Sequence, residues 1–147
     1  MDAGYSRGMI DPENPVVRLV MESNEAEVAA DRERQRALLR EAWEAATTPY
    51  ERAVAAHYIA RIQPTPAGSH HWNRDALDHA RQAPPEAVRA LMPSLHLAFA
   101  ESLERAGSLA RAAEAYRDAI EAASGLPEAE GYVRAAQEGL ERVGERA

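Results

Sequence analysis

Cysteine and lysine are both absent from this 147-residue chain. Without cysteine, disulfide bonds, thiolate metal ligands and a cysteine nucleophile are all excluded. No run approaches the ~20 apolar residues that a membrane-spanning helix needs, so we expect no membrane partner. Residues 1–14 are polar and lack the basic and apolar regions of a secretion signal, which favours a cytoplasmic location.

Because lysine is absent, arginine and histidine supply every basic side chain, and the formal net charge is −7. Binding a phosphate backbone needs a basic surface, so this balance argues against nucleic acid as a partner. Arginine and alanine have GC-rich codons. Their frequent use therefore predicts a bacterial, GC-rich genome rather than a mechanism.

Alanine, glutamate, arginine and leucine dominate the composition, while aromatic residues reach only 5%. Ala, Leu, Arg and Glu lose little side-chain freedom in a helix, whereas β-branched residues lose more. We therefore expect an all-α fold. The chain is long enough for one domain with its own core, which we place at residues 15–147, after a flexible segment at 1–14.

One seven-residue pattern occurs three times. It consists of Arg, an acid, Ala, a large apolar residue, an acid, any residue and Ala, and it is found at 40–46, 74–80 and 117–123. The first two copies are 34 residues apart and the last two 43 apart. A period of 34 residues is typical of the tetratricopeptide repeat, and about nine extra residues at 84–92 account for the longer interval.

Proline, glycine and capping residues predict where the helices begin and end. Residues 48–51, Thr-Pro-Tyr-Glu, form a capping box with proline at the first helical position, so a helix is expected from there to Ile62. Further helices are expected over 69–81, 86–106, 109–123 and 127–144, with Pro93 kinking or restarting the one at 86–106.

The third predicted helix pair resembles a tetratricopeptide repeat. This family has small or apolar residues at set places along two antiparallel helices, and the matching residues are Phe99, Ala100, Leu103, Gly107, Ala112, Tyr116 and Ala119. Small residues let the helices approach closely, and Tyr116 is expected to fill the gap above them.

Two earlier pairs follow the same pattern less closely. Leu19, Ser23, Ala26 and Ala30 would face Leu39, Ala42 and Trp43 in the first, with Gln35 where the family prefers Ala; Ala53, Ala56 and Ala60 would face Trp72 and Ala76 in the second. The helix at 127–144 has apolar residues at helical spacing and would cap the last open face. The resemblance thus implies about three repeats plus a capping helix, stacked as a short right-handed superhelix.

Members of this family commonly bind a peptide or helix of a partner on the concave side, which the first helix of each pair lines. The resemblance therefore implies a partner-binding groove, in which Tyr58 is our expected aromatic anchor. A clamp for a C-terminal carboxylate is not expected, because only Asn24 of its usual residues is kept. The predicted groove residues are Asn24, Val54, Tyr58, Arg61, Leu97, Glu101, Glu104 and Arg105, with Val20 and Glu27 beside them.

The histidines are candidate metal ligands and candidate catalytic bases. His71, Asp75 and His79 recur every four residues, but over two turns they span ~12 Å, too far for one metal with bonds near ~2 Å. His57 could pair with a carboxylate on paper, yet no nucleophile elbow or phosphate loop accompanies it. We therefore expect no metal, no cofactor and no enzymatic activity.

The leading interpretation is a non-catalytic module that binds a protein or peptide partner in the concave groove. One alternative is self-association, since the exposed end of a short helix stack could form a symmetric dimer. Another is a peptide- or ligand-sensing regulatory domain, and the last is an unrecognised enzyme with a cleft containing His57.

Overall fold

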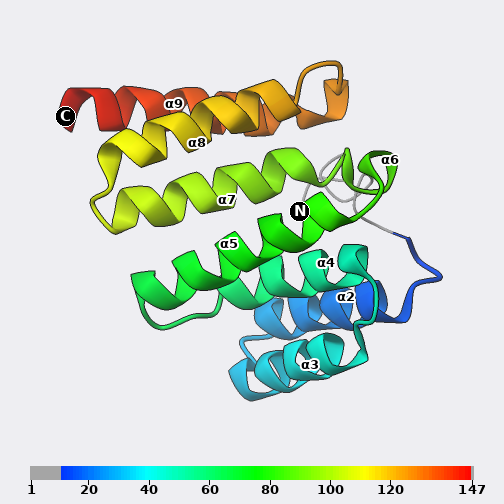
Figure 1. The fold of residues 1–147 in the computed structure, drawn as a ribbon. Helices are drawn as coiled ribbons and strands as arrows, with labels where there is room; N and C mark the ends of the chain where they lie inside the picture. Colours follow the sequence, from blue (N-terminus) through cyan, green and yellow to red (C-terminus); the bar gives the residue numbers. More distant parts are fainter. Residues whose placement is uncertain (1–10, 147) are drawn as a thin grey trace.

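A computed structural model describes residues 11–146, and all the regular secondary structure of this part is helical (Figure 1). The predicted all-α class is therefore confirmed. The helices are α2 (Pro15–Val28), α3 (Arg32–Ala45), α4 (Pro49–Ala60), α5 (Pro66–Gln82), α6 (Pro85–Val88), α7 (Met92–Arg105), α8 (Leu109–Ala122), the 3₁₀ helix η1 (Pro127–Ala129) and α9 (Glu130–Arg146).

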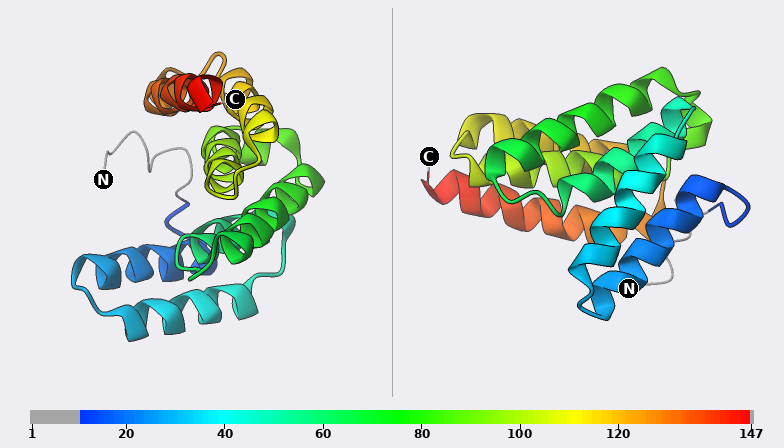
Figure 2. Two further views of the ribbon diagram at one scale, coloured as in Figure 1. Left: turned by 90° about the vertical axis from the view of Figure 1, so that its left-hand side faces the viewer. Right: turned by 90° about the horizontal axis from the view of Figure 1, so that it is seen from below.

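The helices pack as antiparallel neighbours along the chain. The closest contacts join α2 to α3, α4 to α5, α7 to α8 and α8 to α9. Further contacts stack the pairs, with α2 against α4, α5 against α7 and α7 against α9. Seen from the side, the stack bends around a concave space, with α2–α5 below it and α7–α9 above it (Figure 2).

The repeated seven-residue pattern lies at the same place in the second helix of each pair. Its first alanine is fully buried in all three copies, at Ala42, Ala76 and Ala119. The first helices have their own buried small residues, including Ala26, Ala56 and Ala100, each with no exposed surface. An alanine at a crossing lets two helix backbones approach closely, so the pattern sets how tightly each pair packs.

Capping residues fix the starts of α2 and α4. The capping box predicted at Thr48 forms, with its side chain accepting from Glu51 N–H while Glu51 accepts from Thr48 N–H. Asn14 caps α2 by accepting from Val16 and Val17, and its Nδ2 donates to Glu51 at 2.9 Å. Residues 1–10 of the segment expected to be flexible lie outside the described residues. Asn14, grouped with them, is joined to α4 through Glu51.

Several helix bounds differ from the predicted ones. Helix α5 begins at Pro66 rather than residue 69, because Thr65 caps it by accepting from Gly68 N–H. Over 86–106, where Pro93 was expected to kink or restart a helix, there are two helices, α6 and α7, with Pro93 in the first turn of α7. Ala30, expected on a helix face, lies exposed in the α2–α3 turn with a left-handed φ of 59°.

Tyr116 joins α8 to α7 and α9. Its side chain has no exposed surface, as expected of a gap-filling residue. Its hydroxyl donates to Glu104 Oε1 at 2.5 Å, and Arg142 of α9 donates to both carboxylate oxygens of Glu104 at 3.0 and 3.1 Å. Gly139 of α9 lies directly over the Tyr116 ring, so a side chain there would overlap the ring.

Two clusters of buried residues form the core. The first comprises α2–α6 and the start of α7, and the second comprises the rest of α7, α8 and α9. Phe99 packs against both clusters and stacks on His70 of α5, with ring centroids 5.2 Å apart. Trp43 and Trp72 pack edge to face, with ring centroids 5.0 Å apart, and so join α3 to α5.

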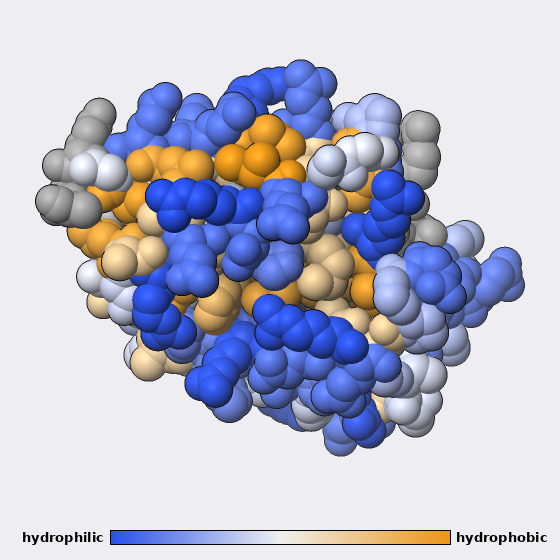
Figure 3. Space-filling view, turned by 45° about the horizontal axis from the view of Figure 1, so that its top comes forward, coloured by the Kyte–Doolittle hydropathy of each residue, from blue (hydrophilic) through white to orange (hydrophobic). Residues whose placement is uncertain are grey.

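The surface is mixed in character. On the face viewed in Figure 3, hydrophilic residues surround smaller hydrophobic patches. Within residues 11–146, the helices include none long and apolar enough to cross a bilayer.

Replacing Gly139 by alanine tests the packing of α9 on Tyr116. We expect Gly139→Ala to lower the free energy of unfolding by about 1–3 kcal/mol, since the methyl group forces the ring or the helix to move. Gly131→Ala on the same helix is the matched control. Gly131 is exposed with open space around its Cα, so alanine should stabilise the helix by up to about 1 kcal/mol. Urea unfolding measures both, and equal effects would contradict the close contact.

Candidate functional site

A groove of about 620 Å³ lies on the concave side of the stack. It is formed by the first helices of the three pairs, α2, α4 and α7, and one residue of α9 completes it. Its lining residues are Met21, Asn24, Glu25, Glu27, Val28, His57, Tyr58, Arg61, Ser94, Leu97, Ala98, Glu101 and Tyr132. This volume falls within the roughly 300–1,000 Å³ of typical ligand pockets.

Five of the eight predicted groove residues line it: Asn24, Tyr58, Arg61, Leu97 and Glu101. The structure therefore brings together side chains from three helices that the sequence separates by up to 77 residues. Tyr58, however, is only 7% exposed and belongs to the first core cluster. It forms part of the groove floor and also packs against the core, so it is not a freely exposed anchor.

The other three predicted residues lie elsewhere. Val54 is 2% exposed within the first core cluster. Glu104, at the C-terminal end of α7, is hydrogen-bonded to Tyr116 and Arg142. Arg105 donates to Ser69 Oγ of α5 at 3.2 Å. Val20, expected beside them, is also buried in the core.

Two exposed apolar residues of the groove were not predicted. Met21 is 37% exposed and Val28 is 89% exposed, and both lie on α2. Helical periodicity did not identify these two residues. Val28 is the last residue of α2, so no later turn of the helix repeats its position. Exposed apolar side chains beside a hollow indicate a surface that gains by being covered.

Acidic side chains outnumber basic ones in the groove. Arg61 pairs with Glu27 at 3.3 Å, and its guanidinium lies 5.4 Å from the centre of the Tyr58 ring. Glu25 and Glu101 add two more carboxylates, so three acids face one cation. Burial raises the pKa of Glu101, although Arg105 and Arg142 act in the opposite direction.

His57 forms part of the groove wall and is 9% exposed. Its ring meets Tyr58 edge to face at 5.1 Å, and its buried Nδ1 has no hydrogen-bond partner within residues 11–146. Burial, with a smaller contribution from Arg61, lowers the pKa of His57 to about 4. The ring is therefore neutral at physiological pH.

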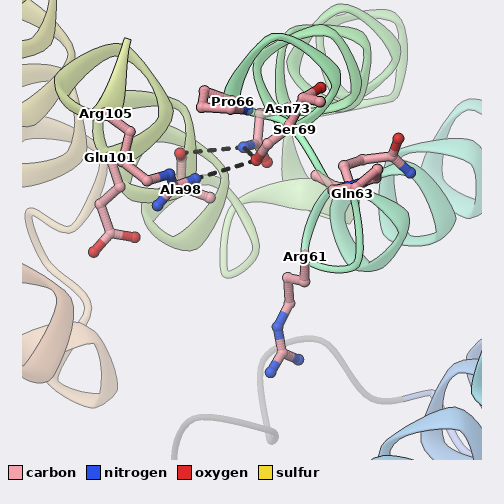
Figure 4. A pocket seen from close by; sticks show the side chains of 11 residues that line it. Arg61, Gln63, Pro66, Ser69, Asn73, Ala98, Glu101 and Arg105 are labelled. Atoms are coloured by element: carbon pink, nitrogen blue, oxygen red, sulfur yellow. Dashed lines mark hydrogen bonds between the residues drawn. The ribbon is translucent and has the colours of Figure 1, made fainter. Parts of the chain in front are cut away.

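A second hollow of about 500 Å³ adjoins the groove between α5 and α7. Asn73 Nδ2 donates to the carbonyl oxygen of Ala98 at 3.2 Å, and the neighbouring Ser69 receives the bond from Arg105 (Figure 4). Arg61, Ala98 and Glu101 line both hollows, which therefore join at these residues.

The residues considered for metal binding and catalysis are paired in other ways. Asp75 lies 3.5 Å from His79, while Glu51 holds the cap of α4. Among the described residues, no hydrogen bond or ion pair joins either carboxylate to His57. In the described residues, no group of three or more His, Asp or Glu side chains could hold a metal ion.

Comparisons with known protein families, with curated proteins and with solved structures found no match. The resemblance to tetratricopeptide repeats therefore stays a prediction, based on the residues that support it.

The buried His57 predicts a pH dependence of stability. The folded pKa is about 4 and the ordinary value is 6.5, so the unfolded chain binds the proton more tightly. The contribution of neutral His57 to stability is fully present above pH 6.5 and is lost as the pH drops towards 4. Between pH 7 and 4, the wild type should lose roughly 3 kcal/mol more unfolding free energy than His57→Phe. Urea unfolding at both pH values measures this difference, and equal losses would show that His57 is not buried as described.

Proposed function

We propose that this chain is a non-catalytic, tetratricopeptide-like interaction module that binds a segment of a partner protein in its concave groove. The cytoplasm of a bacterium is its proposed setting. The observation that most favours this function is the groove itself, where exposed Met21 and Val28 lie beside the apolar side chains of Tyr58 and Leu97.

The position of the groove supports binding of a chain segment rather than a small metabolite. It opens along three successive first helices, so an occupant can contact side chains from α2, α4 and α7 together. Because these residues belong to helices rather than loops, binding does not have to order a flexible segment. The polar lining residues are spread over these helices, from Asn24 on α2 to Glu101 on α7, so an extended occupant can contact more of them than a compact one.

Self-association remains the second candidate, because a second copy could also cover Met21 and Val28. The charge disfavours it: the groove is acidic, and the whole chain has a formal net charge of −7. Like charges brought together across an interface weaken association. A partner segment is therefore the better occupant.

A charge placed on the apolar rim of the groove, formed by Met21 and Val28, should weaken binding without unfolding the protein. A phage-displayed library of random dodecapeptides, panned against the wild type, supplies the probes. We expect Met21→Asp and Val28→Asp each to weaken binding of the selected peptides by about tenfold or more, because an aspartate there must lose water on contact. Both side chains are exposed, so the melting temperature should change little.

Ala110→Asp is the matched control. Ala110 is exposed in the first turn of α8, a helix that supplies no residue to the groove, and the substitution adds the same charge. Peptide affinity is measured by isothermal titration calorimetry, and self-association by sedimentation velocity. Peptides that bind all four proteins equally would contradict the groove as the site. A dimer lost in Val28→Asp but kept in Ala110→Asp would assign the groove to a second copy.

A further inference from the structure

We propose that the groove selects partner segments carrying an arginine or lysine beside apolar residues, and that Glu101 binds this cation. The inference rests on the proposed function and names the chemistry of the partner. It follows from the position of Glu101, from the charge of the groove and from the way the neighbouring cations are already engaged.

Glu101 lies where three hollows meet. It lines the groove, the hollow between α5 and α7, and a third hollow shared with Glu104, Arg105 and Arg142. Figure 4 shows its side chain extending away from the hydrogen bonds of Ser69, Asn73 and Ala98, on the same side as Arg61. A ligand in the groove can therefore reach the carboxylate.

The nearby arginines have other partners. Arg61 pairs with Glu27, Arg105 donates to Ser69, and Arg142 donates twice to Glu104. Glu101 itself makes no side-chain hydrogen bond or ion pair among the described residues, although it is half-buried. A half-buried carboxylate without a bonded cation is costly, and a cation from a ligand would remove that cost.

The neutral His57 supports a ligand at this place. Its ring lines the same groove, is nine-tenths buried and keeps a nitrogen without a hydrogen bond among residues 11–146. A buried nitrogen of His57 on α4 and the carboxylate of Glu101 on α7 thus lack hydrogen-bond partners among the described residues. A segment that places a cation near Glu101 and apolar side chains against Met21 and Leu97 fits this arrangement.

The cost of Glu101 separates binding from folding. Burial raises the pKa of Glu101 from its ordinary value of 4.5, because the folded state disfavours the ionised carboxylate. At neutral pH, where this carboxylate is ionised, its charge therefore lowers the stability of the fold. Glutamine at this position keeps the shape and removes the charge. The charged and hydroxyl groups that interact electrostatically with Glu101 are Glu104, Arg105, Tyr116 and Arg142. The other ionisable or polar residues around it line the same hollows, namely Arg61 and His57 at α4, and Ser69 and Asn73 on α5.

The test is a double-mutant cycle on the peptides selected from the dodecapeptide library. We expect wild-type protein to select peptides with Arg or Lys at one recurring position between apolar residues. Changing that residue to glutamine should weaken binding to wild type by about tenfold and to Glu101→Gln much less. Glu138→Gln, an exposed acid of α9 outside the groove, should behave as wild type.

The melting temperature separates recognition from a structural role. Glu101→Gln should melt no lower than wild type, whereas a residue needed for packing would lower it. If peptides depend on Val28 but lose the same affinity from the cation change in wild type and Glu101→Gln, the assignment of Glu101 is wrong and the groove function stands. If no selected peptide depends on Met21 or Val28, the proposed function fails, and this inference fails with it.

Discussion

Close approach between helices at buried alanines determines the geometry of this protein. Ala42, Ala76 and Ala119 occupy equivalent places in the second helices and have no exposed surface. A larger side chain at such a crossing would push the two backbones apart, and the displacement would pass to every later helix in the stack. The same constraint appears between α8 and α9, where Gly139 has no side chain and so leaves room for the ring of Tyr116. Large side chains are then needed only in a few gaps, which explains how a chain with 5% aromatic residues builds a continuous core.

The insertion between the second and third pairs changes how the stack continues. Helix α6 adds Val88, and the turn after it adds Leu91, to the first core cluster. At the other junctions the next helix packs on both helices of the preceding pair, α4 on α2 and α3, and α9 on α7 and α8, but here α7 packs on α5 and has no comparable contact with α4. The contact is partly polar, through Asn73 and Ser69, and Leu95 and Phe99 of α7 supply apolar packing. Because α7 lies away from α4 at this junction, space remains between them, and the groove and the adjoining hollow occupy it.

The sequence predicted the fold better than the site, for a physical reason. Helix starts depend on local chemistry, so the capping box at Thr48 could be recognised from four residues. Exposure depends on where neighbouring helices end. Val54 and Tyr58 are one turn apart on the same face of α4, and periodicity cannot tell them apart. Val54 is covered by the first core cluster, whereas Tyr58 reaches the edge where α7 diverges and so lines the groove. Val28 was missed for the converse reason, since a single valine at a helix end has no periodic signal, and only the third dimension shows the hollow beside it.

The proposed recognition depends on the junction between α5 and α7. An array built only for stability would fill this space with apolar side chains, yet Glu101, Arg61 and Ala98 are found where the two hollows join. Burial raises the pKa of Glu101, so its charge opposes folding at neutral pH, and the surrounding arginines are held by Glu27, Ser69 and Glu104. A stable stack tolerates this cost because the alanine crossings on either side do not depend on it. In the proposed recognition, a cation of the partner segment meets this charge, and exposed Met21 and Val28 provide the apolar contact beside it.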